Sequence, residues 1–539
     1  MKLCKTNGTL SPNFLDSKVR WCAFLLFAAG IPAVLATQLQ AEPAKQDITD
    51  QGITTAVDRD LIQESGLDSQ ELDVSSSDGI VTLAGTVDNL LVKVRAIRIA
   101  ESIRGVRGVI DRMTVTVLPR PDESVRKDII SALEQDPATA SYKLAVTVDG
   151  PVATLTGSVS SNAEKQLAAR LVMGVRGVGE VRNQIAIKYS TMRTNQEISN
   201  DITARLQWDV WIDGDLIKPI VKDGAVQLTG VIGSAISRSR AIDDAWVAGV
   251  TAVDGDKLQV EPRDSNGPHK EHEDAARSDS QIKQALQTAL LLDPRVSSSL
   301  PDVTVEGGGV ILAGNVGNLK AANSAVQDAK NIVGVWRVDN LLKVRPPELR
   351  TDVEMEKELK AALTWDPMLD SESISVSVKN HVARLSGSVA SKFQRAEAQD
   401  VASRTKGIVS VLNTLKAEAD PSNSYFVDIS NDGYGEWPYY SYSTDPFYSP
   451  WVANSGLYQS RWPMSDQQIE SSIRRRLFWS PFVERKDIQV SVKERVATLT
   501  GKVATRIGWS EAGKDATSGG ATAVVNDIRI VQSAWWWSW

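Results

Sequence analysis

The sequence predicts an α/β (α+β) protein made of six tandem α-β-β-α-β modules, each a three-stranded sheet with two helices on one face. Three observations predict this fold. A strand phrase of the form VxLxGxV, with Ala at the first place or Ile at the last in four copies, occurs six times. A helical stretch precedes each copy, and a second helical stretch and a last strand follow it. The chain has 539 residues, which is long enough for several folding units.

The first 41 residues have the order of a secretory signal peptide, in which basic residues, a short apolar run and small residues follow one another. Cleavage after Ala36 or Ala41 fits this order. The alternative is an uncleaved membrane anchor, for which the apolar run is short. Both cysteines, Cys4 and Cys22, lie in this segment. The mature chain would therefore have no disulfide and no thiolate ligand.

Each module is expected to begin with a helix that stops at a fixed place. In residues 122–135 apolar side chains recur at helical spacing, and Asp136-Pro137 follows. Proline lacks a backbone N–H and forces the residue before it out of helical geometry, so the helix must end there. Modules four, five and six have an Asp-Pro or Ser-Pro stop at the same place, whereas module one has Ser65-Gly66 and module three has Asp209-Val210.

A hairpin that contains the repeated phrase should follow the first helix. Asp149-Gly150 and Asp223-Gly224 have the chemistry of hairpin turns. A glycine that closes a strand indicates a bend or a close backbone approach, and we expect it to let the chain leave the sheet and begin the second helix. Phosphate binding by these glycines is the alternative. The repeat glycines, spaced by 72, 73, 84, 73 and 114 residues, are Gly85, Gly157, Gly230, Gly314, Gly387 and Gly501.

The second helix, as in residues 161–173, should lead into a last strand that begins with a GVxxVxN pattern. In module six, four glycines in or near the second helix (Gly508, Gly513, Gly519 and Gly520) predict that it is short or frayed, because an interior glycine costs about 1 kcal/mol relative to alanine. Two insertions break the period. Residues 263–276 are polar, and residues 419–463 are rich in Tyr and Pro. We interpret the second insertion as an extended spacer, with aromatic stacking on glycans as the alternative.

A helix that ends at Asp-Pro, the VxLxGxV phrase and the GVxxVxN ending together resemble the BON domain, a family named for bacterial osmotically inducible periplasmic and nodulation proteins. The resemblance implies a non-enzymatic α/β module of a Gram-negative cell envelope, associated with phospholipid attachment and osmotic or envelope stress. The predicted boundaries are 1–41 for the signal peptide, 47–119, 121–190, 193–262, 277–346, 348–418 and 464–534 for the modules, 263–276 and 419–463 for the linkers, and 535–539 for a Trp-rich tail.

No catalytic, cofactor-binding or metal site is expected. His269 and His272 in the HKEH stretch have no recognisable third ligand, and His381 falls at a hairpin turn. The segment 508–515, GWSEAGKD, is one residue shorter than a P-loop, and Asp515 stands where Ser or Thr should hold Mg²⁺. The formal net charge of −7 also argues against nucleic acid as a partner, because phosphate neutralisation needs a basic footprint.

Three local features favour contact with an anionic phospholipid surface. They are a basic second helix in module one, three consecutive arginines in module six, and the terminal WWWSW. Tryptophan prefers the membrane interface, and each cation near an anionic leaflet gains about 1 kcal/mol. The alternatives are an ordinary solvated helix face and tryptophans that pack on module six or bind a protein. The candidate lipid-binding residues are Lys93, Arg95, Arg98, Arg104, Arg107, Arg474, Arg475, Arg476, Trp535, Trp536, Trp537 and Trp539.

We therefore expect a non-enzymatic, exported protein of the periplasm, peripheral to a membrane. Several weak modules on one chain would bind a phospholipid surface by avidity and would support envelope integrity under osmotic or envelope stress. The alternative is a structural or scaffold protein whose repeats bind other envelope proteins or peptidoglycan.

Overall fold

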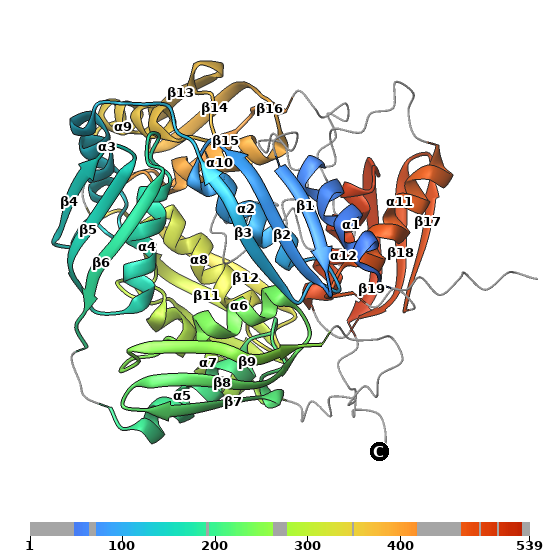
Figure 1. Cartoon of the computed structure of the whole chain (residues 1–539). Helices are drawn as coiled ribbons and strands as arrows, with labels where there is room; N and C mark the ends of the chain where they lie inside the picture. The colour runs from blue at the N-terminus through green and yellow to red at the C-terminus, as the bar shows by residue number, and fades with distance from the viewer. Residues whose placement is uncertain are drawn as a thin grey trace, which may run out of the picture. The chain divides into compact units, whose positions relative to one another are not determined.

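The computed structural model (Figure 1) describes the chain in eight stretches. The predicted signal peptide, both predicted linkers and the Trp-rich tail lie outside them. The described residues are 48–63, 72–189, 193–261, 277–347, 350–417, 465–483, 487–503 and 506–530.

Each module begins with a 14-residue helix. In module 2 this helix ends because Asp136, the residue before a proline, has extended backbone angles (φ −71°, ψ 121°). Asp209 has nearly the same angles (φ −81°, ψ 119°) although no proline follows it. The first helices are α1 (Asp50–Gln63), α3 (Asp122–Gln135), α5 (Asn195–Trp208), α7 (Asp279–Leu292), α9 (Asp352–Trp365) and α11 (Asp466–Trp479).

Capping fixes where these helices start in modules 3 to 6. Thr351, for example, accepts a hydrogen bond from the backbone N–H of Glu354, whose carboxylate accepts one from the Thr351 backbone in return. The next residue, Asp352, accepts the backbone N–H groups of Asn380 and His381 at 2.8 and 3.0 Å. The helix start is thereby tied to the turn of the hairpin.

The hairpin that follows is antiparallel, with both turn residues at positive φ where the turn is Asp-Gly, Gly-Gly, Asn-His or Glu-Arg. In module 2 the expected Asp149-Gly150 turn is displaced by one residue, because Asp149 pairs with Val152 and the turn is Gly150-Pro151. Short 3₁₀ turns, η2 (Gly214–Leu216) and η3 (Ser371–Ser373), precede two of the hairpins. The hairpin strands are β1 (Leu72–Ser77) and β2 (Ile80–Val87), β4 (Leu144–Asp149) and β5 (Val152–Val159), β7 (Ile217–Lys222) and β8 (Ala225–Ile232), β10 (Asp302–Glu306) and β11 (Gly309–Val316), β13 (Ile374–Lys379) and β14 (Val382–Val389), and β17 (Ile488–Lys493) and β18 (Val496–Val503).

A second helix then crosses back, and the last strand pairs in parallel with the glycine-containing strand, which is the middle strand of each sheet. The second helices are α2 (Leu90–Glu101), α4 (Asn162–Met173), α6 (Ala235–Asp244), α8 (Leu319–Lys330), α10 (Lys392–Arg404) and α12 (Arg506–Ser518). The last strands are β3 (Gly108–Val115), β6 (Glu180–Ile187), β9 (Ala252–Val260), β12 (Arg337–Val344), β15 (Ser410–Asn413) with β16 (Lys416–Ala417), and β19 (Ala523–Ile530). The predicted module, a three-stranded sheet with two helices on one face, is confirmed in all six copies.

The asparagine of the GVxxVxN pattern ties the last strand to the second helix. The side-chain amide of Asn183 donates to the carbonyl of Lys165 at 3.0 Å, and Asn413 and Asn526 make the same bond to their own second helices. Module 3 has Gly255 at this place, and the pairing of β8 with β9 shifts register there. The guanidinium of Arg238 donates to the Gly255 carbonyl instead.

The repeat glycines do not end their strands, which corrects our expectation. Each strand runs two residues further, as β5 does from Gly157 to Val159. Gly157 has φ 133°, and a Cβ there would lie 2.6 Å from the carbonyl oxygen of Lys143. The glycine therefore admits the incoming hairpin strand rather than releasing the outgoing helix. A Cβ added at Gly314 would have more room, since the nearest atom, on the side chain of Asp302, would be 3.5 Å away, but the φ of 106° still favours glycine.

The second helix of module 6 is not short. It has 13 residues, as many as α10. Gly513 lies where a Cβ would be 3.2 Å from the side chain of Asn526, and Ala512 and Ala516 on the same helix are fully buried. Small residues let α12 approach its sheet and α11 closely, so packing outweighs the low helix propensity of glycine.

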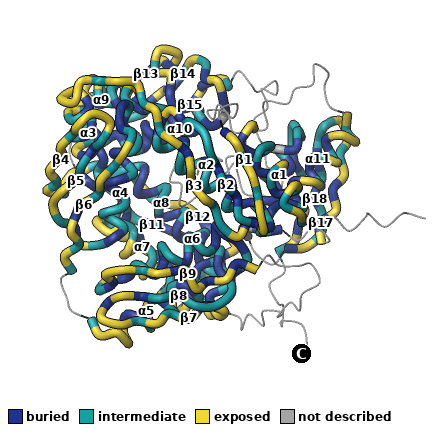
Figure 2. Tube along the Cα trace, in the orientation of Figure 1, coloured by how far each residue is buried: buried dark blue, intermediate teal, exposed yellow. Residues whose placement is uncertain are grey.

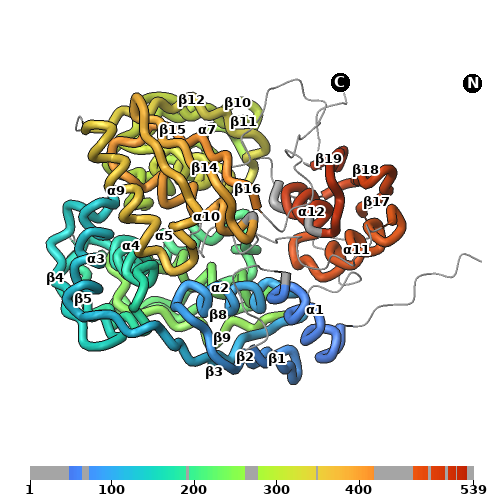
Figure 3. The backbone as a smooth tube through the Cα atoms, turned by 90° about the horizontal axis from the view of Figure 1, so that it is seen from above, coloured from blue at the N-terminus to red at the C-terminus, as the bar shows by residue number. Residues whose placement is uncertain are grey.

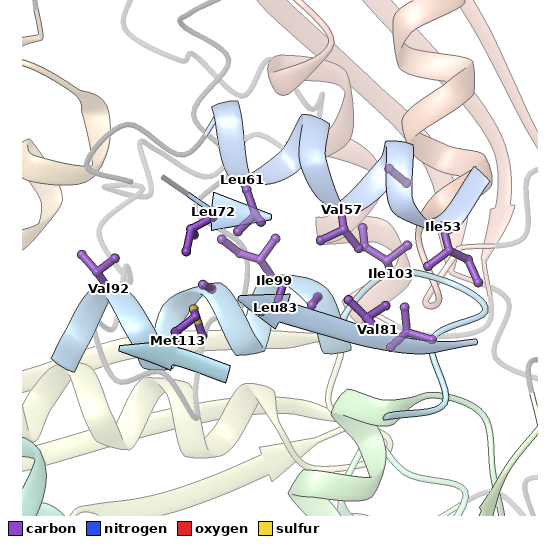
Figure 4. Close-up of a cluster of buried hydrophobic side chains, with 14 of the residues drawn as sticks. Ile53, Val57, Leu61, Leu72, Val81, Leu83, Val92, Ile99, Ile103 and Met113 are labelled. Atoms are coloured by element: carbon purple, nitrogen blue, oxygen red, sulfur yellow. The ribbon is translucent and has the colours of Figure 1, made fainter. Parts of the chain in front are cut away.

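Each module has its own hydrophobic core between the sheet and the two helices. In module 1, Val57 of α1, Leu83 of β2 and Ile99 of α2 point toward one another (Figure 4). Along the last strands exposed residues alternate with less exposed ones, as in β6 (Figure 2), so one face of each sheet is turned away from the core. The core of module 1 also includes Trp479 from module 6 and Phe393 from module 5.

Candidate functional site

The basic side chains of the second helix in module 1 have partners within the protein. Lys93 forms an ion pair with Asp111 at 2.9 Å, and Arg98 forms one with Glu101 at 2.8 Å. The guanidinium of Arg95 lies 3.8 Å from the centre of the Phe393 ring of module 5, a cation–π contact. These three candidates for lipid binding are therefore engaged by protein groups.

Arg104 and Arg107 follow the same helix and have different surroundings. Arg104 donates from its guanidinium to the carbonyls of Ser480 and Val483 of module 6, at 2.8 and 2.7 Å. Arg107 is exposed. Of this basic group, Arg107 is the side chain that faces solvent.

The three consecutive arginines of module 6 point in three directions, because successive helix residues are rotated by about 100°. Arg474 forms an ion pair with Glu470 and donates to the carbonyl of Val490. Arg475 is exposed. The Arg476 side chain is 4% exposed and lies 3.9 Å from Asp60 of module 1. The run RRR is thus divided between a hairpin contact, solvent and a module contact.

Other sequence candidates are placed as follows. His381 is the second residue of a hairpin turn, with φ 63°. The segment 508–515 lies within helix α12, with Asp515 buried. His269, His272 and the four terminal tryptophans lie outside the described residues. In the described stretches, no cluster of three or more His, Cys, Asp and Glu is arranged to hold a metal ion, and no helix has the length and apolarity needed to cross a bilayer.

Sequence reasoning missed the contacts between modules. The end of the first helix in modules 3, 5 and 6 meets the turn before the last strand in modules 4, 2 and 1 respectively. Three backbone hydrogen bonds mark these meetings: Val333 N–H to the Trp208 carbonyl at 2.9 Å, Arg176 to Trp365 at 2.8 Å, and Arg104 to Trp479 at 3.0 Å. A usable signal was present, since these modules alone have tryptophan as the last residue of the first helix. Helices α9 and α3 of the 5:2 pair lie side by side in Figure 3.

Buried charges line the contacts between modules. Within module 3, on the side that faces module 4, Arg240 lies 2.5 Å from Asp209 and Arg205 lies 3.0 Å from Asp244, and the charges of both arginines also act on Asp328 of module 4. Burial raises the pKa of Asp209 to about 7, with Arg240 opposing the rise. Burial also raises the pKa of Asp328 well above its usual range, and Asp293 adds to the rise.

Modules 5 and 6 also bury carboxylates, and modules 4 and 5 are joined by a buried ion pair. In module 5, burial raises the pKa of Asp366 to about 6, and the charge of Arg404 opposes this. In module 6, burial raises the pKa of Asp515 to about 8 against the charge of Arg476. Lys320 of module 4 forms an ion pair with Asp400 of module 5 at 2.5 Å. Buried charged groups therefore lie beside apolar side chains, such as Phe393 and Trp479, where modules meet.

The outer faces of the sheets, away from the helices, present a different surface. Four modules carry one exposed aliphatic side chain on that face: Ile110 is 44% exposed, Ile220 56%, Leu341 61% and Leu412 43%. Each lies beside an exposed cation, either two residues away on the same strand or directly opposite on the next strand. These cations are Arg112 on β3, Lys218 and Lys222 on β7, Lys343 on β12, and Arg384, which pairs with Leu412 across β14 and β15.

The chain is similar to a curated bacterial protein and to two solved structures. It is 31% identical over 146 residues to osmotically-inducible protein Y of Escherichia coli (strain K12), which covers 26% of this chain and 73% of that protein. Structures of CdsD, a structural protein of the type III secretion system of Chlamydia trachomatis, and of its C-terminal domain also match. The first is 15% identical over 39% of this chain and 92% of that chain, with a TM-score of 0.12. The second is 17% identical over 41% and 96%, with a TM-score of 0.11.

The model of the BON domain matches this chain six times, at residues 49–117, 121–189, 194–262, 278–346, 351–419 and 465–532. Each match contains one set of two helices and three strands. The matches together cover more than half of the sequence. The chain therefore belongs to the BON domain family.

Proposed function

We propose that this protein is a non-enzymatic, multivalent protein of the cell envelope that attaches to anionic phospholipid surfaces from the periplasm. It would support envelope integrity under osmotic stress, in line with its similarity to an osmotically-inducible protein. The observation that carries the proposal is the pairing of an exposed aliphatic side chain with a cation on the outer sheet face of four modules.

Physical arguments support the outer sheet faces as the lipid-contacting surface. The helix faces are engaged by other modules, whereas Ile110, Leu341 and their counterparts face solvent. An aliphatic side chain that enters the interface gains hydrophobic free energy, and the neighbouring cation gains about 1 kcal/mol near an anionic leaflet. One module would bind weakly. Linked modules would raise the apparent affinity by effective concentration.

The test is co-sedimentation of the full mature chain with vesicles of phosphatidylglycerol or of phosphatidylcholine. The variant Ile110→Ser, Ile220→Ser, Leu341→Ser, Leu412→Ser should lose at least about tenfold in apparent affinity for the anionic vesicles. The matched control is Leu118→Ser with Val353→Ser, which removes two aliphatic side chains that are 77% and 78% exposed but lie outside the sheets. Equal pelleting of the four-site variant and the control would contradict the proposal.

Three further variants test the candidates from the sequence. Removal of residues 535–539 tests the terminal tryptophans. Arg475→Ser tests the exposed member of the arginine run, and Arg107→Ser tests the exposed arginine of module 1. Each change should weaken binding to phosphatidylglycerol, and so should added salt, because exposed charges are screened. Unchanged pelleting in a given arm removes that residue from the proposed surface.

A second candidate function is a scaffold that binds other envelope proteins or peptidoglycan. The contacts between modules favour it, because they show BON modules that recognise protein surfaces within one chain. Co-sedimentation with purified peptidoglycan in place of vesicles distinguishes the two candidates. Pelleting with peptidoglycan that survives the four serine substitutions would favour the scaffold.

A further inference from the structure

We propose that the modules are of two complementary kinds, and that the end of the first helix in modules 3, 5 and 6 is a docking site. Its partner is the Gly-Val turn before the last strand of a BON module of the other kind, which is Gly105-Val106, Gly177-Val178 or Gly334-Val335. We term the first kind acceptor modules and the second kind, modules 1, 2 and 4, donor modules. This proposal does not depend on lipid binding.

A recurring set of contacts carries the proposal. The carbonyl of the last helix residue, a tryptophan in every acceptor, accepts the backbone N–H of the residue just before the Gly-Val turn of the donor. In two of the three pairs that donor residue is an arginine, whose guanidinium reaches two more carbonyls at equivalent places. Arg104 contacts Ser480 and Val483, and Arg176 contacts Asp366 and Leu369 at 2.9 Å each. The 6:1 and 5:2 pairs thus share one backbone bond and two guanidinium bonds at equivalent positions, which requires that the two pairs dock with the same geometry.

The tryptophan supplies the apolar part of the docking. Trp479 is 6% exposed and belongs to the core of module 1. Trp365 packs against the core of module 2 as well as its own. Trp208 packs against the core of module 4, where Arg277 stacks on its ring at 4.9 Å. Each acceptor therefore places its tryptophan against the donor core, and Trp479 is buried in it.

Two of the donor modules lack the acceptor features. Module 2 has Gln135 and module 4 has Leu292 in place of the tryptophan. Their next carbonyls are used within the module: Asp136 accepts from Thr139 and Ala140, and Asp293 accepts from Val296 and Ser297. In modules 5 and 6 the equivalent carbonyl, of Asp366 or Ser480, accepts from the donor arginine instead. Module 3, whose partner has no such arginine, closes the carbonyl of Asp209 with Ile212 of its own turn and is distinguished by Trp208 alone. The corresponding loop of module 1 lies outside the described residues.

The docking also explains why module 3 has Val210 where modules 5 and 6 have proline. The backbone N–H of Val210 donates to the carbonyl of Asn331 at 3.0 Å, which completes a two-residue antiparallel bridge between modules 3 and 4. Proline has no N–H to donate. The 3:4 pair, which has no donor arginine, gains this second backbone bond instead.

Shape restricts which donor fits which acceptor. A Cβ on Gly52 of module 1 would lie 3.0 Å from the ring of Trp479. Modules 2 and 4 have Ser124 and Gln281 at the same helix position. Module 1 therefore has room for the Trp479 ring where the other donors carry a side chain.

The test uses hydrogen exchange of individual amides in the full mature chain. Trp365→Leu, which introduces the residue found in module 4, and Arg176→Met, which keeps the side-chain stem, should each speed exchange of the amide at position 176 at least about tenfold. The amides of Val210 and Val333 in the 3:4 pair should be unchanged. Arg182→Met, an exposed arginine of the same module, is the matched control. Unchanged exchange at position 176, or equal acceleration in all three pairs, would overturn the proposal.

A compensating pair of substitutions tests the shape argument. Gly52→Ser should speed exchange of the Arg104 amide several-fold, and adding Trp479→Phe should restore most of the protection because the smaller ring makes room for the serine. Exchange in the double variant that is no slower than in Gly52→Ser would overturn the assignment of Gly52 and Trp479 to partner choice.

Discussion

Modules 2 and 5 share one fold and differ at the C-terminal end of the first helix. Both have the same order of helices and strands, and Leu155 and Leu385 are fully buried at the same place in the middle strand. At the end of the first helix module 2 closes its own carbonyl with a turn, whereas module 5 offers the carbonyls of Trp365 and Asp366 to Arg176 of module 2. The core pattern therefore fixes what a module is, and a few residues at a helix end decide what it binds.

The largest expected effect concerns the shared core. Leu155→Ala and Leu385→Ala should each destabilise their own module by about 3 kcal/mol, because both remove a fully buried side chain and leave a cavity. Exchange of core amides in mild denaturant measures each module separately. A difference of more than about 2 kcal/mol between the two variants would break the equivalence of the two cores.

The next effect is the pH dependence of the stability of module 5, the acceptor module that contains Asp366. The pKa of Asp366 is raised to about 6 in the folded chain, so the folded state binds a proton at this carboxyl more tightly than the unfolded state does. The protonated carboxyl therefore favours the fold fully below pH 3.8, and this stabilisation is lost as the pH rises to about 6. Asp366→Asn should therefore remove this loss and raise the free energy of unfolding of module 5 at pH 7 by up to about 3 kcal/mol. Urea unfolding of the unaltered protein and of Asp366→Asn at pH 4, 5, 6 and 7 gives the difference between their free energies of unfolding. A difference that does not grow between pH 4 and 6 would contradict the prediction.

A smaller effect on the free energy of unfolding should distinguish the turn before the last strand in module 2 from the equivalent turn in module 5. Arg176→Met should weaken the 2:5 contact by about 1.5 kcal/mol, since two hydrogen bonds from a charged group are lost. Lys406 stands at the equivalent place in module 5, and Lys406→Met should change the unfolding free energy by less than about 0.5 kcal/mol. Urea titrations of the two variants decide this, and equal losses would mean that the turn does not distinguish donor from acceptor.

The smallest effect is local and lies at the hairpin turns. Asp352 accepts the N–H groups of both turn residues in module 5, and these bonds hold its pKa below the usual value. Module 2 has Pro151 in its turn, which has no N–H to offer Asp122. Asp352→Ala should speed exchange of the Asn380 and His381 amides. Asp122→Ala should leave exchange in its own turn unchanged, and an acceleration there would show that the contact does not depend on the N–H group.

Local patterns were sufficient for the module but not for the candidate site. Apolar spacing, the stops at Asp136 and Asp366, and the repeated glycine predicted the five elements, because each depends on residues close in sequence. The same reasoning assigned Arg104 and Arg476 to a membrane, whereas one donates to module 6 and the other is buried beside module 1. An arginine on a helix looks the same in sequence whether solvent, lipid or another module faces it.

The sequence by itself determined the six-fold repeat, the order of elements and the glycine positions, since side-chain periodicity and backbone sterics act within one module. Only the tertiary structure decided which modules meet, that Trp365 packs against the core of its neighbour, and that Asp515 is buried among charges. Those outcomes depend on surfaces that are far apart along the chain, and their cost or gain arises when water is removed between them.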